Sequence, residues 1–206
     1  MSDNAPPARP WQPDATLGIG KARARMLARA RAFFATHEVL EVETPHLSAA
    51  AVSDPHIESL AVRLQVRPGE SWYLHTSPEF AMKRLLCAGW PDIYQVCKVF
   101  RDGEIGPHHQ PEFTMVEWYR RDISMRAMME HTADFIMQML DERQPAGLPV
   151  YLSYAEAFRE FAGIDPHDAS LHDIRSAAQA DSDLCAALGD DRNGWLDLLL
   201  MKRVAP

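Results

Sequence analysis

The chain has 206 residues, of which 47% are apolar and 24% charged, and its formal net charge is −8. This composition is typical of a globular protein that can bury a real core, and the acidic balance argues against a surface that wraps an extended nucleic-acid backbone. No apolar stretch approaches the roughly 18 to 20 residues that cross a bilayer, and the first residues lack the order of a signal peptide, so no membrane association is expected.

The N-terminal part of the chain predicts an arm, a helix and a strand. Residues 1–16 are rich in Pro, Ala and Asp and are expected to form a flexible arm, ahead of a folded core that spans residues 17–206. Over residues 21–36, apolar side chains recur at the spacing of an amphipathic helix. The stretch 39–44 is then typical of a strand, which Pro45 ends.

Two short strands and a helix are predicted next. The strands cover residues 59–66 and 72–75, with a turn at Pro68-Gly69 between them. The segment Thr76-Ser77-Pro78-Glu79 has the chemistry of a helix start, in which Thr76 and Glu79 would form a capping box. That cap alone is one explanation of why a glutamate stands at position 79.

Two longer strands and a second helical block follow. The strands are predicted at residues 93–101 and 113–120, on either side of a polar loop. A helix is expected from Ser124, and its buried face would consist of Met125, Met128, Met129, Phe135, Ile136, Met139 and Leu140.

The C-terminal part predicts short helices at residues 154–161, 171–179 and 195–204. Ser153 and Glu156 have the spacing of a capping box at the first of them. The strands cluster along the chain without a regular β-α-β alternation. We therefore expect an α+β fold, with an antiparallel sheet flanked by helices.

The strand at 113–120 carries a candidate pocket for an amine. Residues two apart in a strand share a face, so Glu117 and Tyr119 are expected to point the same way as Phe113. A carboxylate and a phenol flanked by apolar groups make a partly desolvated pocket, which favours an ammonium group if the charges pair. A strand whose polar end lies in solvent would explain the same residues without any function.

Arg101 is a candidate ligand for an anion. It ends the first long strand and opens the loop that contains Gly103 and Gly106. A guanidinium offers phosphate oxygens a planar pair of donors that lysine cannot provide. A surface salt bridge with Glu104 or Glu112 is the structural alternative.

Other chemical motifs are missing or weak. The chain contains no G-x-G-x-x-G, H-E-x-x-H or G-x-S-x-G pattern, and the adjacent His108 and His109 are expected to be solvated. Cys87, Cys97 and Cys185 show no C-x-x-C spacing, so neither a disulfide framework nor a zinc site is predicted. No metal ligand is assigned, and a reducing cytoplasm is the expected location.

The chain resembles the catalytic core of class II lysyl-tRNA synthetases, from about residue 11 to residue 206. Within that family, Ser77-Pro78-Glu79 and Trp118-Tyr119-Arg120 are closer to the short paralogues that lack an anticodon-binding domain and modify elongation factor P. The resemblance rests on Pro45 after a helix and strand, on Thr76-Ser77-Pro78-Glu79 with Met82-Lys83-Arg84-Leu85, on Phe100-Arg101, and on the segment 111–119.

The resemblance implies an adenylate-forming ligase that uses ATP and Mg²⁺. The carboxylate of (R)-β-lysine or lysine would attack the α-phosphorus of ATP and release pyrophosphate, and the acyl group would then pass to a lysine side chain of elongation factor P. Residues 21–45 would form the interface of a homodimer, and tRNA is not an expected partner.

The same resemblance implies roles for individual residues. Arg101 would hold the α-phosphate as the catalytic residue, and Glu117 would bind the amino group of the substrate. ATP would also contact Asp102, Gly103, Gln110 and Phe113, and the amino-acid pocket would be lined by Ser77, Pro78, Glu79, Glu117 and Tyr119.

Two features depart from the family pattern. The chain has Arg101-Asp102-Gly103-Glu104 where Arg-x-Glu is usual, so the role of Glu104 stays open. The third class II motif has no match, and the carboxylates for Mg²⁺ are expected there. We therefore expect a C-terminally truncated core that turns over little by itself. A lysyl-tRNA synthetase core fragment and a noncatalytic dimerising paralogue are the alternatives.

Overall fold

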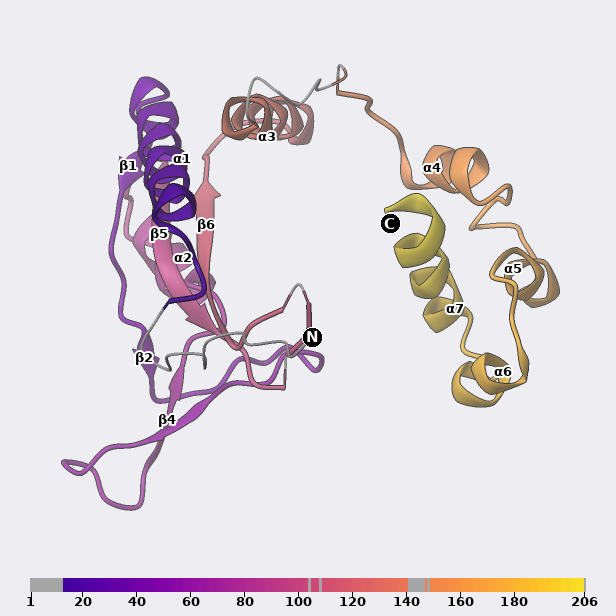
Figure 1. Cartoon of the computed structure of the whole chain (residues 1–206), viewed down its shortest axis with the longest axis horizontal. Helices are drawn as coiled ribbons and strands as arrows, with labels where there is room; N and C mark the ends of the chain where they lie inside the picture. Colours follow the sequence, from indigo (N-terminus) through magenta and orange to yellow (C-terminus); the bar gives the residue numbers. More distant parts are fainter. Residues whose placement is uncertain (1–12, 104, 108, 141–146, 148, 206) are drawn as a thin grey trace, which may run out of the picture. The chain divides into compact units, whose positions relative to one another are not determined.

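The computed structural model describes residues 13–103, 105–107, 109–140, 147 and 149–205 (Figure 1). The chain divides into two compact units between residues 146 and 147. The prediction that residues 17–206 form one core stays a prediction. Most of the predicted arm, together with Glu104 and His108, lies outside the described residues.

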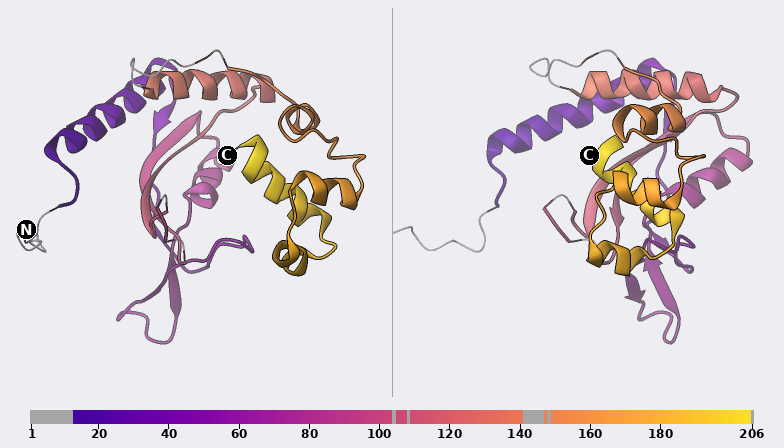
Figure 2. Two further views of the ribbon diagram at one scale, coloured as in Figure 1. Left: turned by 45° about the vertical axis from the view of Figure 1, so that its right-hand side comes forward. Right: turned by 90° about the vertical axis from the view of Figure 1, so that its right-hand side faces the viewer.

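The larger sheet of the first unit consists of β1 (Leu40–Glu41), β5 (Ile93–Phe100) and β6 (Glu112–Tyr119), in the order β1-β5-β6. The antiparallel pairing of β5 with β6 extends over the whole of both strands, so the two longest predicted strands are confirmed (Figure 2). β1 runs parallel to β5, and the expectation of a wholly antiparallel sheet is wrong there. The long connection between β1 and β5 gives the chain room to return in the same direction.

A smaller antiparallel sheet contains β2 (Leu47–Ser48), β4 (Ser71–Leu74) and β3 (Ala61–Arg63), in that order. These strands confirm the two short strands that the sequence predicts. His75 ties the two sheets together, because its amide donates to the carbonyl of His46 (2.9 Å) and its carbonyl accepts from the amide of Phe100 (3.0 Å).

Helices α1 (Leu17–Thr36) and α3 (Met125–Met139) cover one face of the larger sheet. α1 begins earlier than predicted because the Thr16 hydroxyl caps it, accepting from the amide of Ile19 at 3.3 Å. The fully buried Phe34 stacks on Tyr94 of β5, with ring centroids 4.1 Å apart. This aromatic contact anchors α1 on the sheet.

The predicted buried face of α3 is right for Phe135, which packs in the apolar cluster, and wrong for two of its members. Met125 is 80% exposed and Ile136 is 51% exposed, whereas the buried side chain of this helix is His131. His131 and Phe135 lie one turn apart and pack against Phe33 of α1. α3 therefore makes a narrow contact through two aromatic rings, and its methionines are largely left outside it.

Helix α2 (Glu79–Cys87) lies on the other side of the larger sheet, where Met82 is completely buried against Val42 and Ile93. The predicted capping box between Thr76 and Glu79 is wrong. Pro78 is the N-cap, so Glu79 stands at the first helical position instead of the third. A glutamate there cannot reach back to cap, and its carboxylate pairs with a lysine one turn along the helix.

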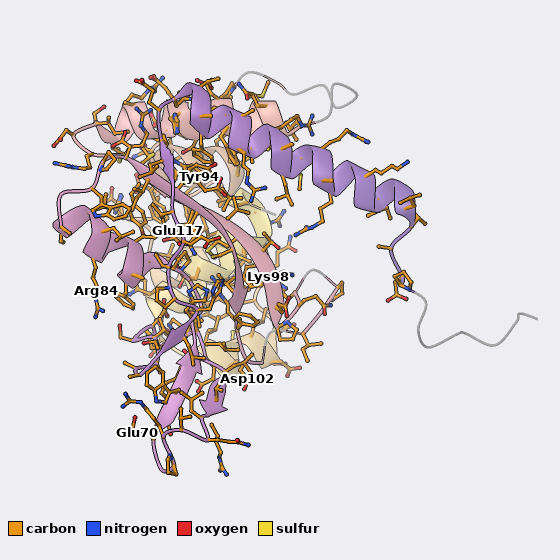
Figure 3. The ribbon with its side chains drawn as sticks, turned by 90° about the vertical axis from the view of Figure 1, so that its left-hand side faces the viewer. Glu70, Arg84, Tyr94, Lys98, Asp102 and Glu117 are labelled. Carbon is orange, nitrogen blue, oxygen red and sulfur yellow. The ribbon has the colours of Figure 1, made fainter. Side chains whose placement is uncertain are left out.

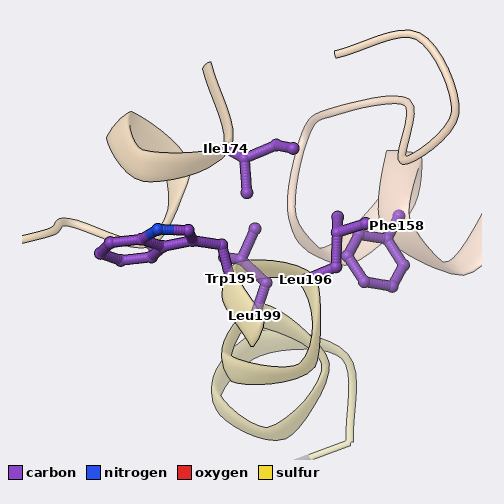
Figure 4. Packing of buried hydrophobic residues seen from close by; sticks show 6 residues of the cluster. Phe158, Ile174, Trp195, Leu196 and Leu199 are labelled. Carbon is purple, nitrogen blue, oxygen red and sulfur yellow. The ribbon is translucent and has the colours of Figure 1, made fainter. Parts of the chain in front are cut away.

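The second unit is a small helical cluster. Its core is apolar, with Phe158, Ile174, Trp195 and Leu199 fully buried (Figure 4). The capping box at Ser153 is confirmed. The described elements of the second unit are α4 (Tyr154–Phe161), α5 (Leu171–Ala177), α6 (Ser182–Leu188), α7 (Arg192–Leu199) and the π-helical turn η1 (Leu200–Val204).

α6 is the one helix among these that the sequence did not predict, and it contributes no buried residue that would have marked a face. None of the helices in the described part of the chain has the length and apolarity to cross a membrane.

Candidate functional site

The two faces of β6 differ as the sequence predicts. Val116 and Trp118 pack with Phe34 beneath α1 and α3. Tyr119 points to the opposite face, where it packs with Met82 of α2, and Glu117 lies on that face with it. The alternation of strand residues therefore puts the predicted acid and phenol on one side of the sheet.

Glu117 is held by two hydroxyl groups. Ser77 Oγ donates to Oε2 of Glu117 at 2.6 Å, and the Tyr119 hydroxyl donates to Oε1 at 2.6 Å. Burial, followed by the bond to Glu117, raises the pKa of Tyr119, so the phenol remains a donor. Each carboxylate oxygen has a second lone pair, so this arrangement can still accept hydrogen bonds from an ammonium group.

Ser77 also connects this carboxylate to α2. The Ser77 hydroxyl accepts from the amide of Glu79 at 3.1 Å while it donates to Glu117. The Glu79 carboxylate accepts from Lys83 Nζ at 2.5 Å. Pro78 is buried at the start of the helix and helps to fix its position. The predicted amino-acid pocket therefore joins one helix start to one strand.

Arg101 lies at the end of β5, next to the same segment. Its Nε donates to the carbonyl of Thr76 at 3.5 Å, and its guanidinium carbon lies 5.2 Å from the ring centre of Phe113. Thr76 directly precedes Ser77, so the predicted phosphate ligand and the predicted amine ligand are joined through two consecutive residues.

A cavity of about 520 Å³ lies beside Arg101. Gln110 and Phe113, both predicted ATP contacts, line it together with Arg101. Arg23, Lys98 and His109 add further basic groups, and the remaining lining residues are Glu112 and Thr114. This excess of cations suits a polyphosphate.

Two of the basic side chains around this cavity are held by contacts of their terminal nitrogens. Arg23 donates to the Thr114 hydroxyl at 2.6 Å, and Lys98 pairs with Glu112 at 2.8 Å. Figure 3 shows Lys98 on the strand and Asp102 in the loop that follows it. The sequence left open a salt bridge of Arg101 with Glu104 or Glu112. Glu112 pairs with Lys98, and Glu104 lies outside the described residues.

Asp102 and Gly103 brace the loop and do not line this cavity. The Asp102 carboxylate accepts from the amide of Gly103 at 2.8 Å, and the Asp102 amide donates to the carbonyl of Glu58 at 2.9 Å. Gly103 has a φ of 75°, which a residue with a side chain adopts only with strain. Both predicted ATP contacts thus have a local structural role.

A second cavity, of about 490 Å³, lies on the other side of the Thr76-Ser77 segment. Ser77 and Glu79 line it, together with Thr44 and Arg84. Glu117 and Tyr119 line neither of the two cavities. The predicted residues are therefore joined by hydrogen bonds but are not gathered around one shared hollow.

Several residues that complete this region were not predicted. Gln95 lies opposite Glu117 in the sheet and accepts from the buried Thr44 hydroxyl at 2.9 Å. Arg23 and the carbonyl of Thr76 support the basic cavity. The alternation of residues along β5, paired with β6, could have predicted that Gln95 lies on the face of Glu117. No pattern near Arg23 in the sequence indicates that this residue of α1 reaches the cavity.

Three possible metal ligands also meet near this face. The ligand atoms of His46, His75 and Cys97 all lie within 4.8 Å of one another. Burial lowers the pKa of His75, and burial raises the pKa of the Cys97 thiol to about 11. Two imidazoles and a thiol are soft donors that suit a thiophilic cation and not Mg²⁺, which prefers oxygen.

Comparison with known proteins shows which sequences the chain is similar to. The model of the family described as class II tRNA synthetases (D, K and N) matches residues 15–179. Proteins named elongation factor P–(R)-beta-lysine ligase from Salmonella gallinarum and Salmonella paratyphi B are each 44% identical to the chain over 201 residues, which is 95% of this chain and 60% of each relative. The chain thus spans about 60% of the length of these relatives.

Proposed function

The chain belongs to the class II tRNA synthetase family, and on that basis we propose that it is the part of an elongation factor P-modifying ligase that activates a lysine-type amino acid with ATP. The names of the Salmonella relatives, and their 44% sequence identity to the chain, support a lysine-type substrate and elongation factor P as the partner. The observation that carries the proposal is the connection from Arg101 through Thr76 and Ser77 to Glu117. It joins a ligand for an anion to a ligand for an amine.

The first step of the proposed reaction forms an acyl-adenylate. A carboxylate oxygen of the amino acid attacks the α-phosphorus of ATP, and the bond from that phosphorus to the bridging oxygen breaks. Pyrophosphate leaves with the electron pair. Arg101 donates to the α-phosphate oxygens as their charge changes, and the basic cavity beside it accommodates the remaining phosphates. Phe113, against which Arg101 rests, offers a face on which adenine stacks.

The second step transfers the acyl group to protein. The ε-amine of a lysine on elongation factor P attacks the acyl carbon, loses a proton, and displaces AMP. Throughout, Glu117 holds an ammonium group of the bound amino acid, while Ser77 and Tyr119 fix the orientation of its carboxylate. Holding both ends of the substrate supplies proximity, which lowers the barrier of both steps.

ATP-dependent enzymes of this kind use Mg²⁺, and the described residues bring no group of three oxygen ligands together as a preformed site for it. The three side chains that approach one another closely enough to share a metal ion include a thiol and two imidazoles, whereas Mg²⁺ takes oxygen ligands in octahedral geometry. No step of the reaction is therefore assigned to Mg²⁺ on these residues.

A homodimer in the cytoplasm is part of the same proposal. Within the predicted interface at residues 21–45, Met26 of α1 and Leu40 of β1 are 39% and 46% exposed. Apolar side chains left in contact with water along one segment favour burial against a second copy. Sedimentation equilibrium tests this, because Met26→Lys combined with Leu40→Lys is expected to yield a monomer if this segment is the interface.

The test of the proposed activity is ATP–pyrophosphate exchange in the full-length protein. We expect exchange to be driven by (R)-β-lysine in preference to α-lysine, followed by attachment of the labelled amino acid to elongation factor P. Preference for α-lysine together with charging of tRNA would instead favour the synthetase, which the breadth of the matched family allows. Exchange with neither amino acid would leave the noncatalytic paralogue as the correct interpretation.

A further inference from the structure

His46, His75 and Cys97 form a cluster that the proposed reaction does not use. His46 directly precedes β2, His75 directly follows β4, and Cys97 lies in β5, so the ligands come from three separate segments of the chain. Their ligand atoms all lie within 4.8 Å of one another. Because the three positions are far apart in the sequence, no ligand spacing such as C-x-x-C could have predicted them.

The backbone holds the cluster together. The His75 amide donates to the carbonyl of His46 at 2.9 Å, and the Phe100 amide donates to the carbonyl of His75 at 3.0 Å. The two imidazole rings meet edge to face with centroids 4.7 Å apart. The ligands are therefore preassembled by main-chain pairing, which reduces the conformational entropy that binding a metal would cost.

The hydrogen bond of His75 prepares its ring for coordination. Nε2 of His75 lies 2.8 Å from the carbonyl oxygen of Lys98, which can only accept, so Nε2 carries the proton. Nδ1 is then the nitrogen with a free lone pair. Metal-binding histidines commonly donate their second ring nitrogen to a carbonyl or carboxylate in this way, which fixes the tautomer and the ring orientation.

We infer that His46, His75 and Cys97 are three protein ligands of a thiophilic divalent cation, with Zn²⁺ as the best match. Thiolate and imidazole are both ligands that Zn²⁺ takes in proteins, and three protein ligands leave one position for water or another group. Bond lengths of about 2.0–2.3 Å put neighbouring ligand atoms about 3.3–3.8 Å apart. Cys97 is buried but His46 is exposed, so rotation of the His46 ring can close the remaining distance and the metal has a route in.

A metal here would tie the small sheet to the larger one beside the proposed substrate residues. His75 directly precedes Thr76 and Ser77, and Cys97 shares the strand face that carries Gln95 opposite Glu117. The cation would thus stiffen the segment that contacts both Arg101 and Glu117. This inference concerns binding and stands apart from the proposed reaction, so its test needs no enzyme activity.

Titration of the metal-stripped, untagged protein with Zn²⁺ by calorimetry tests the site. We expect one ion per chain, and titration with Co²⁺ should give the near-ultraviolet charge-transfer band of a cobalt–thiolate bond. His46→Ala should weaken Zn²⁺ binding more than about 100-fold, because losing a direct ligand exceeds the 10–100-fold cost of losing a supporting hydrogen bond. Because the His46 side chain is exposed, this variant is expected to keep its fold, which circular dichroism verifies.

Cys97→Ser should remove the cobalt–thiolate band, and matched controls distinguish this site from adventitious binding. His56→Ala changes another exposed histidine, and Cys87→Ser with Cys185→Ser changes the exposed thiols, so all three should leave binding unchanged. Absence of binding up to millimolar Zn²⁺ would overturn the inference. Unchanged affinity in His46→Ala, or a Co²⁺ spectrum without the thiolate band, would overturn it as well.

Discussion

The two faces of the sheet β1-β5-β6 are built from alternate residues of the same strands, yet they differ in kind. One face presents Tyr94 and Trp118 to the aromatic side chains of α1 and α3. The other presents Gln95, Cys97 and Glu117, whose polar atoms lie among hydrogen-bond partners and ionisable groups. A one-residue step along a strand thus separates an aromatic cluster from a row of polar groups.

The difference shows how a partly buried carboxylate is tolerated in a small protein. Glu117 has two hydroxyl donors, and the neighbouring Gln95 is bonded to Thr44. Leaving such groups without partners would cost stability. The apolar face supplies stability through packing, so changes on the two faces should have separable effects on unfolding and on ligand binding.

The largest expected effect is on the apolar face. Phe34→Ala removes a ring that is completely buried against Tyr94, and it should lower the free energy of unfolding by about 3–5 kcal/mol. Urea denaturation followed by circular dichroism measures it. Phe80→Ala, at a side chain that is 57% exposed, is the control and should change stability by less than about 1 kcal/mol. Equal losses in the two variants would contradict the assignment of the core.

Arg101→Ala should lower activity and leave stability nearly unchanged. We expect ATP–pyrophosphate exchange in the full-length protein to fall by about 10²–10³-fold, as when a donor to a developing charge is removed, with little change in urea denaturation. Arg101→Lys should also be impaired, because an ammonium does not reproduce the planar pair of donors. Arg126→Ala, an exposed arginine of α3, is the matched control. Normal exchange in Arg101→Ala would remove this residue from the mechanism.

Glu117→Gln should weaken amino-acid binding by about 10- to 100-fold, since a hydrogen bond to a charged group contributes about 1.5–3 kcal/mol. The amide oxygen can still accept from Ser77 or Tyr119, so the fold should persist. The Michaelis constant for the amino acid in the exchange assay measures the change. Glu130→Gln on α3 serves as control. An unaltered constant would mean that the carboxylate is structural.

The smallest expected effect is a dependence of stability on pH through His131, on the apolar side. Burial lowers its pKa, with Arg120 and His37 acting in the same direction and Asp134 and Asp92 against it. Because the unfolded chain then binds the proton more readily, the contribution to stability is complete above about pH 6.5 and is lost as the pH falls below that value.

Urea midpoints between about pH 7.5 and 5.5 test this effect. His131→Gln keeps an acceptor for Arg120, which donates to Nδ1 of His131 at 3.2 Å, but it cannot titrate. We expect the midpoint of this variant to fall less steeply with decreasing pH. An identical slope in the two proteins would assign the pH dependence to other groups.

The features that could be predicted from the sequence are those that local patterns determine. The β5–β6 pair, the alternation that groups Glu117 with Tyr119, and the helix caps at Ser124 and Ser153 all follow from spacing within a few residues. The parallel pairing of β1 could not be predicted in this way, because it depends on a partner about fifty residues away.

The rest of the site depends on contacts between distant segments. The ionic surroundings of Arg101 include Arg23 from α1, and the cluster of His46, His75 and Cys97 is assembled from three separate segments. The predicted buried side of α3 included Phe135, which does contact α1, but it did not include His131, the most buried side chain of the helix. Apolar character alone did not indicate which side chains the neighbouring helix would cover.

The hydroxyl of Ser77 accepts from the amide of Glu79 and donates its single hydrogen to Glu117. A positive charge that docks on Glu117 therefore polarises this hydroxyl and alters the electron density around the amide proton at the start of α2. The nitrogen–proton resonance of Glu79 is thus a built-in spectroscopic reporter, able to register occupancy of the carboxylate without any label on the ligand.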